Sequence, residues 1–375
     1  MSPTEQGGPE PIVEEIGTAV YTVPCDETEA DGTLTWHSTT LVLVHVRSEG
    51  VVGLGYTYGA PATAQVIEDQ LADVVVGRSV WGTAAVNDAM NTVVRNAGRP
   101  GLVSGALSAV DIALWDLKSR LLDLPLSQLL GAARAEVPVY GSGGFTTYGA
   151  ARQDAQLRGW VEEQGIPRVK IKIGEEWGTR QGRDLERVAE ARRSIGEGVE
   201  LFTDANGAYS RKQAIRVARG LDGEGVTWFE EPVSSDDLEG LSQVRAVSAT
   251  DVAAGEYGYD LTYFGHMLAA EAVDCLQIDV TRCGGVTVWL RAAALAEASS
   301  LGVSAHCAPH LHAHVGAAAP NLRHVEWFHD HVRIETWLFH GALDPSGGYL
   351  RPGVSGRPGH GLTLREDVAE PFRVR

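Results

Sequence analysis

After residue 165 of this 375-residue chain, strand-like runs repeatedly end in a lysine, an acid or a histidine. The residues are Lys172, Asp204, Glu230, Glu256, Asp279, His306 and Glu326. The intervals between them are 32, 26, 26, 23, 27 and 20 residues, each about one strand plus one helix. A (β/α) barrel gathers the C-terminal ends of its strands on one face. The spacing therefore predicts an α/β fold in which these residues converge.

The first of these runs, residues 168–174, predicts a buried strand with two lysines on one face. Three apolar residues alternate with Lys170 and Lys172, which are half of the four lysines in the chain. Strand residues two apart lie on the same side. A like-charged neighbour lowers the pKa of a lysine, so one of the pair can become a base. Two solvated lysines on an edge strand are the structural alternative.

The composition is that of a packed globular protein with an acidic excess. Apolar residues make up 44% of the chain, and the formal net charge is −18. This charge disfavours nucleic acid and anionic membranes as partners, while a bound metal would still admit an anionic small substrate. The polar first residues do not resemble a signal peptide, and no apolar run reaches membrane-spanning length. We therefore expect a cytoplasmic protein.

The pattern changes near residue 133, which predicts two domains. Strand-like alternation covers residues 12–58, with a polar loop expected from Cys25 to Thr35, and helical spacing covers residues 62–131. From residue 137, short strands alternate with helices expected at 182–194, 211–221, 237–247 and 286–301. We expect an N-terminal α+β capping domain (1–133), a barrel (134–345) and a C-terminal segment that returns to the capping domain (346–375).

A closed barrel accounts for this alternation better than a doubly wound sheet does. No G-x-G-x-x-G motif follows the first strand of the alternating region. The candidate site residues also come from at least seven strand ends, as a barrel requires.

Three carboxylates, Asp204, Glu230 and Glu256, end consecutive predicted strands and should lie together. Without a cation they would repel one another strongly in a protected pocket. A hard divalent cation removes this repulsion, and ligation by oxygen atoms alone points to Mg²⁺. The structural alternative is that all three belong to separate ion pairs.

Asp279 and His306 end adjacent predicted strands, where the carboxylate can hold the imidazole tautomer and raise its basicity. A lone histidine in this position is more often structural. Lys172 comes from roughly the opposite side of the barrel, so a substrate would have a base on each face. A metal-bound carboxylate beside such bases is the arrangement needed to remove an α-proton. Glu326, if kept protonated, would donate a hydrogen bond to the substrate carboxylate.

These motifs resemble the enolase superfamily and, within it, the mandelate racemase subgroup. They are Lys170-Ile-Lys172, Asp204-Ala-Asn206, Glu230-Glu-Pro232, Gly255-Glu256, Asp279, His306 and Glu326. The resemblance covers nearly the whole chain and implies a modified TIM barrel, (β/α)7β, with an α+β capping domain. The muconate-lactonising subgroup is less similar, because it places a lysine on the opposite face and this chain has none after Lys212.

The resemblance also implies a role for each motif. The three carboxylates would bind one Mg²⁺ per subunit. Lys172 would be one acid/base and the His306–Asp279 dyad the other, with Lys170 lowering the pKa of Lys172. Glu326 would be the electrophilic partner of the substrate carboxylate. A homo-oligomer, such as an octamer, is implied in the same way.

Two bases allow two reactions. Removing the α-proton on one face and returning it on the other gives racemisation or epimerisation. If the β-carbon bears a hydroxyl group, the conjugate acid can expel it as water, which gives a 2-keto-3-deoxy acid. Acid-sugar dehydration is the commoner activity among similar proteins, so the resemblance favours a Mg²⁺-dependent dehydratase. A zinc-dependent hydrolase and a catalytically silent binding relative are rival classes.

Substrate selectivity is expected from capping-domain loops, at residues 25–37 and 56–60. Trp36 and His37 are candidate contacts, although packing against the barrel rim is the alternative for Trp36. The candidate contacts from the barrel are Lys170, Asn206, Glu326 and His329. His331 is expected to line the pocket with His329, close to Glu326.

Cysteine and histidine patterns give little support for a zinc site. The four cysteines lack C-x-x-C spacing and are expected to be buried small residues: Cys25, Cys275, Cys283 and Cys307. His310, His312 and His314 alternate at a spacing of two, which matches neither common helical zinc motif.

Overall fold

The computed structural model describes residues 10–375, and its N-terminal part is built on a three-stranded antiparallel sheet. The strands follow in the order β1 (Glu15–Ala30), β2 (Thr35–Ser48) and β3 (Val51–Tyr58). Both faces of the sheet are covered, which explains why β2 carries a continuous apolar run. Leu41 and Leu43 pack into the core shared with the barrel, whereas Val42 and Val44 pack among the capping helices.

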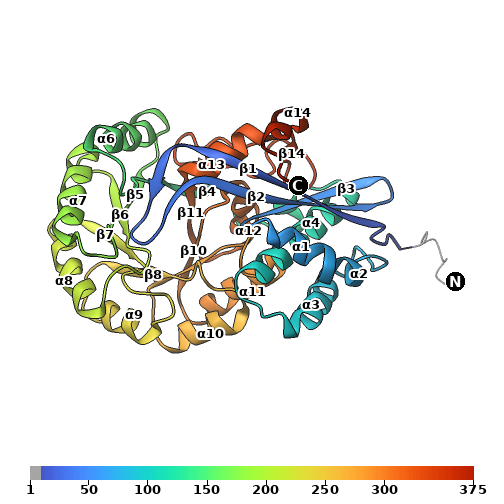
Figure 1. Cartoon of the computed structure of the whole chain (residues 1–375), viewed down its shortest axis with the longest axis horizontal. Helices are drawn as coiled ribbons and strands as arrows, with labels where there is room; N and C mark the ends of the chain where they lie inside the picture. Colours follow the sequence, from blue (N-terminus) through green and yellow to red (C-terminus); the bar gives the residue numbers. More distant parts are fainter. Residues whose placement is uncertain (1–9) are drawn as a thin grey trace.

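The hairpin of β1 and β2 is longer than the sequence suggests. The predicted loop from Cys25 to Thr35 is wrong, since β1 continues to Ala30 and only residues 31–34 form the turn. Backbone pairing tolerates polar side chains, and a register shift after Pro24 lets the strands continue. The tip then contacts the barrel, where the Trp177 N–H donates to the Gly32 carbonyl at 2.9 Å (Figure 1).

The capping helices precede the barrel in the chain. They are α1 (Ala62–Val66), η1 (Ile67–Leu71), α2 (Ala72–Val75), α3 (Thr83–Val93), η2 (Val94–Asn96), α4 (Leu102–Leu121) and α5 (Leu126–Leu129). Helix α4 packs directly on β3, because a Cβ added at Gly55 would lie 2.1 Å from the Ala109 carbonyl oxygen. This contact excludes any larger residue from that point of the strand.

Eight parallel strands form a closed barrel, so the predicted fold class is confirmed. They are β4 (Val137–Gly143), β5 (Arg168–Lys172), β6 (Glu200–Asp204), β7 (Val226–Glu230), β8 (Asp251–Ala254), β9 (Cys275–Ile278), β10 (Gly302–Ala305) and β11 (Leu322–Phe328). Pairing of β11 with β4 closes the ring. All carboxyl ends of the strands therefore open on one face.

Helices follow the strands and cover the outside of the barrel (Figure 1). They are α6 (Ala150–Arg158), η3 (Gly159–Glu163), α7 (Gln181–Ile195), α8 (Arg211–Asp222), α9 (Leu238–Arg245), α10 (Leu261–Ala269), α11 (Gly285–Ala298), α12 (Pro309–Ala318) and α13 (His329–Leu338). The four predicted helices correspond to α7, α8, α9 and α11, with ends displaced by at most three residues. Within residues 10–375, no helix combines the length and apolarity needed to cross a membrane.

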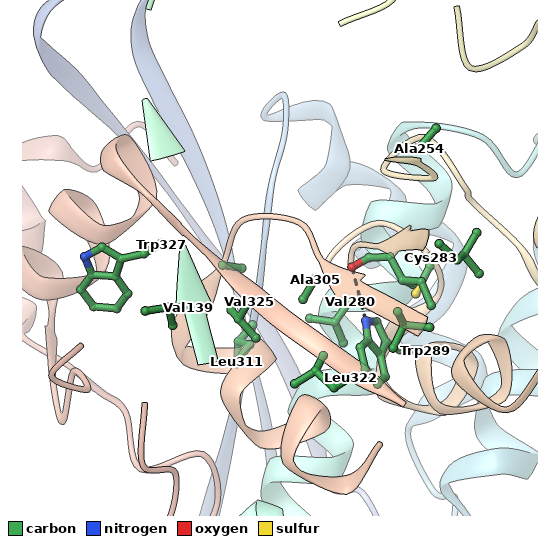
Figure 2. Close-up of a cluster of buried hydrophobic side chains, with 14 of the residues drawn as sticks. Val139, Ala254, Val280, Cys283, Trp289, Ala305, Leu311, Leu322, Val325 and Trp327 are labelled. Carbon is green, nitrogen blue, oxygen red and sulfur yellow. Dashed lines mark hydrogen bonds between the residues drawn. The ribbon is translucent and has the colours of Figure 1, made fainter. Parts of the chain in front are cut away.

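Packing differs between the two sides of the barrel strands. Inside, Tyr140, Phe202 and Trp228 belong to a small aromatic cluster, and the rings of Phe202 and Trp228 stack 5.4 Å apart. Outside, strand and helix side chains form the main core, where the Trp289 indole N–H donates to the Ile278 carbonyl at 3.3 Å (Figure 2). Polar residues contact this cluster as well, since the Gln277 side-chain amide donates to the Tyr140 hydroxyl at 3.1 Å.

The C-terminal segment contacts both parts of the molecule. Its elements are β13 (Tyr349–Leu350), β14 (Thr363–Leu364), α14 (Glu366–Ala369) and η4 (Glu370–Phe372). Strand β14 pairs with β12 (Phe339–His340), which precedes the segment. Strand β13 pairs with β4 of the barrel, and the Val374 N–H donates to the Val20 carbonyl of the cap at 2.8 Å. The domain boundaries at residues 133/134 and 345/346 remain a proposal.

The cysteines follow the expectation except at one position. Cys275, Cys283 and Cys307 are buried, whereas Cys25 is only partly buried because it lies on the hairpin that projects from the sheet.

Candidate active site

The structure brings the predicted strand-end residues together at the carboxyl face of the barrel. Lys172, Asp204 and Glu230 are the last residues of β5, β6 and β7. Glu256 follows β8 by two residues, while Asp279 and His306 directly follow β9 and β10. Glu326 and Lys170 lie within β11 and β5. Parallel pairing of neighbouring strands places all of them around one opening.

The three acids predicted as metal ligands form a compact buried cluster. One oxygen atom from each of Asp204, Glu230 and Glu256 lies within 4.8 Å of the other two. Oε2 of Glu256 is buried and accepts no hydrogen bond from any residue in the described range 10–375. Burial raises the pKa of Glu230 well above its usual value, and the neighbouring acids add to the shift although Lys170 opposes it. Such a cluster of oxygen donors fits a hard divalent cation such as Mg²⁺.

Lys170 is completely buried and connects this cluster to Glu326. Its Nζ lies 2.5 Å from Glu230 Oε1 and 2.7 Å from Glu326 Oε1. Glu326 also accepts from the Ser142 hydroxyl at 2.6 Å and from the Cys307 N–H at 2.8 Å. Burial raises the pKa of Glu326, but Lys170 and other cations outweigh it and hold the pKa well below its usual value. In this arrangement Glu326 accepts both hydrogen bonds, and its expected role as a donor to the substrate carboxylate remains a prediction.

Lys172 lies beside Lys170, as the strand alternation predicts, and is also buried. Its Nζ is 2.5 Å from Asp204 Oδ2. Burial and Lys170 both lower the pKa of Lys172, but Asp204 outweighs them and the net pKa lies above the usual value. Lys170 therefore lowers the pKa of Lys172, as expected, but Asp204 determines the direction of the net shift in this arrangement.

Asp279 and His306 form the predicted dyad across β9 and β10. His306 Nδ1 lies 2.8 Å from Asp279 Oδ2, while Asp279 Oδ1 accepts two hydrogen bonds from Thr281. Burial raises the pKa of Asp279, but the bond to His306 and nearby cations outweigh it and lower the pKa below its usual value. The ionised carboxylate holds the proton on Nδ1, which leaves Nε2 as the basic nitrogen. This nitrogen is 3.3 Å from Glu256 Oε2.

A cavity of about 290 Å³ lies between the strand ends and the hairpin of the capping domain. Lys172, His306, Glu256 and Asn206 line it on the barrel side. Trp36 lines it on the capping side, where its indole N–H donates to Glu29 at 2.9 Å and its ring packs on Phe145. The cavity is small enough to select a small-molecule substrate.

Two predicted substrate contacts lie outside this cavity lining. His37 is exposed and its Nδ1 is 3.1 Å from the Thr28 hydroxyl. The Nε2 atom of His329 is 3.3 Å from Asp26. Their assignment as substrate contacts remains a prediction. Lys170 and Glu326 likewise lie beneath the lining, so their substrate contacts remain predictions.

Several residues of the site were not assigned by sequence reasoning. Arg282 lines the cavity beside Glu256 and Asp279, and the spacing Asp279-x-x-Arg282 after a strand end offered a signal for it. Glu231 is a further buried acid beside the cluster, and burial together with neighbouring acids raises its pKa well above the usual value. Asp330 also lines the cavity, and only tertiary contacts identify it. His331, which the sequence placed near Glu326, lies in the lining as well.

The histidines of α12 have structural partners instead of forming a zinc site. His312 Nε2 accepts from the Val280 N–H at 2.8 Å, and His314 Nδ1 accepts from the Ser127 N–H at 3.2 Å. His310 Nδ1 accepts from the Leu343 N–H at 3.0 Å. A nitrogen that accepts a backbone hydrogen bond cannot also bind a metal.

A buried acid behind the cavity, Glu335, links the capping domain to α13. The Tyr58 hydroxyl donates to Glu335 Oε1 at 2.9 Å, and the Tyr58 ring stacks on His331 with the centroids 3.4 Å apart. Burial raises the pKa of Glu335 from 4.5 to about 8. The group is therefore neutral at pH 7 in the folded protein.

We expect Glu335→Gln to remove part of the pH dependence of stability. Between pH 4.5 and about 8 the folded carboxyl holds a proton that the unfolded chain releases, so wild-type stability falls as pH rises through this window. The loss reaches at most about 5 kcal/mol. Thermal unfolding should therefore show the variant more stable than wild type at pH 8.5 but not at pH 5. The exposed Glu297→Gln control should follow wild type, and a Glu335→Gln curve parallel to wild type would contradict the expectation.

Comparison with known proteins now defines the family. Residues 22–131 match the mandelate racemase/muconate lactonizing enzyme N-terminal domain, and residues 152–368 match the enolase C-terminal domain-like family. The chain belongs to the mandelate racemase/muconate lactonizing enzyme family. This places it in the enolase superfamily, as the motifs predicted.

Members of this family with solved structures share the whole fold. A mandelate racemase/muconate lactonizing enzyme-like protein from Rubrobacter xylanophilus is 49% identical, with a TM-score of 0.93 over 97% of this chain and 100% of that one. A racemase from Streptomyces coelicolor A3(2) with bound magnesium is 30% identical, with a TM-score of 0.91 over 97% and 100%. The L-talarate/galactarate dehydratase of Salmonella typhimurium is 32% identical over 88% of this chain and 81% of its own length.

Proposed function

We propose that this protein removes the α-proton of a carboxylate substrate in a Mg²⁺-dependent reaction that passes through an enediolate. Its substrate is an acid sugar, which it dehydrates to a 2-keto-3-deoxy acid. The observation that carries this proposal is the pair of bases at one cavity. Lys172 on β5 and the His306–Asp279 dyad at β10 and β9 flank the cluster of three carboxylates.

The reaction assigns a task to each of these residues. Asp204, Glu230 and Glu256 would hold Mg²⁺. The bound ion would neutralise the negative charge that develops on the substrate carboxylate. Lys172 Nζ or His306 Nε2 takes the α-proton. The other base, in its protonated form, delivers a proton to the β-hydroxyl group, the C–O bond breaks and water leaves. The resulting enol takes up a proton at the β-carbon and becomes the 2-keto acid.

The geometry of the strands supports a base on each face of the substrate. Strands β5 and β10 are separated by β11 and β4 on one side of the ring and by four strands on the other. Asp279 keeps the proton of His306 on Nδ1, so Nε2 is free to accept one from the cavity side.

Racemisation or epimerisation is the second candidate, and the same two bases support it. The S. coelicolor neighbour is named a racemase, whereas the Salmonella relative is named a dehydratase. We favour dehydration because further relatives of this chain are also named acid-sugar dehydratases, such as the arabinonate dehydratase of Saccharolobus solfataricus. A cytoplasmic homo-oligomer remains part of the proposal from the sequence.

Proton NMR in D₂O with Mg²⁺ tests the proposal. The protein is incubated with a library of sugar acids and smaller α-substituted acids. Deuterium at the α-position establishes enolisation, and formation of a 2-keto acid distinguishes dehydration from racemisation. If no compound exchanged its α-proton and calorimetry detected no Mg²⁺ binding, the proposed function would be overturned. The protein would then be a catalytically silent binding relative.

A further inference from the structure

The cavity has two chemically different ends. The barrel end contains the acid/base residues and the metal cluster. The cap end, as we define it, is lined by Asp31, Trp36, Ser38, Thr39, Asp330 and His331. A long substrate whose carboxylate lies among the barrel-end residues must extend its other end toward this set.

Both cations that line the cavity belong to the barrel end, and both have acidic partners. Lys172 Nζ is 2.5 Å from Asp204, while Arg282 lies 3.4 Å from Asp279 and 3.5 Å from Glu256. The cap end, among residues 10–375, is lined by neither lysine nor arginine. A second carboxylate at the cap end would therefore meet no cation in the lining.

Carboxyl groups dominate the cap end instead. Asp330 accepts from the Thr39 hydroxyl and from Arg333 Nη2 at 2.7 Å, so the nearby arginine is already paired. Oδ1 of Asp31 accepts from the backbone N–H of Leu34 at 2.8 Å within the hairpin turn. Behind Trp36, the buried side chain of Glu29 accepts a hydrogen bond from the indole N–H and supplies no positive charge to this end. The local field opposes a further negative charge.

Uncharged hydrogen-bonding groups remain available at this end. Ser38 is exposed on the cavity wall, and no hydrogen bond of its hydroxyl occurs within residues 10–375. His331 Nδ1 accepts from the Ala308 N–H at 3.2 Å. Burial lowers the pKa of His331 well below its usual value, so the neutral ring carries its proton on Nε2. A hydroxyl group of a substrate can bond to both residues, as acceptor from the histidine and as either partner of the serine.

We propose that the substrate is a monoacid sugar, an aldonate with one carboxylate and an uncharged polyhydroxyl tail, and not the corresponding aldarate diacid. The carboxylate lies at the barrel end, and the tail lies at the cap end against Ser38 and His331. The inference rests on the proposed function and narrows its substrate class. It differs from the chemistry named for the Salmonella relative, since talarate and galactarate are diacids.

Matched pairs of substrates test this inference directly. Gluconate is compared with glucarate, galactonate with galactarate, and arabinonate with arabinarate, by α-proton exchange and 2-keto acid formation with Mg²⁺. We expect at least one aldonate to react with kcat/KM about 100-fold above that of its diacid partner, a difference of about 2.7 kcal/mol. Equal or faster reaction of the diacid overturns the substrate inference while leaving the proposed function intact. Exchange with no member of any pair overturns the inference and also counts against the proposed function.

A designed cation provides an independent test of the same idea. Ser38→Lys places an ammonium group at the cap end, and we expect it to shift the aldarate-to-aldonate ratio of kcat/KM by at least tenfold toward the diacid. Thr35→Lys adds the same charge to an exposed position of β2 outside the cavity lining and should leave the ratio unchanged. Equal shifts in both variants would mean that net charge, not the cap end, governs selectivity and would overturn the inference.

Discussion

Lys172→Ala is expected to lower kcat for dehydration by about 100- to 10,000-fold, because a positioned acid/base contributes that much and no other lysine lines the cavity within residues 10–375. His306→Asn should cause a loss of similar size. The two losses should differ in stereochemistry, since each variant keeps the base on one face of the substrate. This stereochemical difference can be measured as the deuterium exchange of substrates with opposite α-configuration, each assayed separately.

Lys212→Ala is the matched control for the lysine variant. Lys212 is exposed on α8, outside the cavity lining, so its removal should change neither kcat nor exchange. Mg²⁺ binding and thermal unfolding are measured for every variant. These measurements distinguish loss of the catalytic base from unfolding of the protein. Near wild-type turnover in Lys172→Ala, with the fold intact, would contradict the role assigned to this residue.

Glu256→Gln should abolish turnover and weaken Mg²⁺ binding by at least about 100-fold, because a neutral amide replaces one of three charged oxygen ligands. Wild-type Tm should rise with Mg²⁺ concentration, since a ligand that binds only the folded state stabilises it by RT ln(1 + [L]/Kd). The variant should lose this rise at the same Mg²⁺ concentrations. Differential scanning calorimetry with and without Mg²⁺ measures both effects.

The exposed Glu297→Gln variant carries the same chemical change away from the site. Its Tm should rise with Mg²⁺ as in wild type. If Glu256→Gln kept the full Mg²⁺-dependent rise in Tm, the carboxylate cluster would not be the metal site. Loss of turnover without loss of Mg²⁺ binding would instead assign Glu256 to another step.

The barrel and the convergence of the site residues were predictable from the sequence because both depend on regular spacing along the chain. Asp204 and Glu230 end neighbouring strands, and parallel pairing then requires them to be adjacent. The alternation around Lys170 likewise predicted two lysines on one face, since strand periodicity is local. The helices α7 and α8 were recognisable for the same reason.

Other features were beyond sequence reasoning because they depend on contacts between distant segments. The hairpin continues through polar residues that looked like a loop, since backbone pairing and contacts of its tip with the barrel stabilise it. The contact of Glu326 with Lys170 of another strand is one such case, and it lowers the pKa of Glu326 against the effect of burial.

The chain's own pattern therefore determined the fold class, the clustering of Asp204, Glu230 and Glu256, and the convergence of Lys172 and the Asp279–His306 pair on the same face. The sequence offered Trp36 at the cap end of the cavity, but tertiary structure alone decided which side chains meet there. Thr39 meets Asp330 across 291 positions, and behind the cavity Tyr58 meets Glu335 across 277. No local periodicity encodes such pairs, because their positions depend on how the capping hairpin docks on the closed barrel. The charge of the cap end, and with it the substrate class that we infer, arises from that docking.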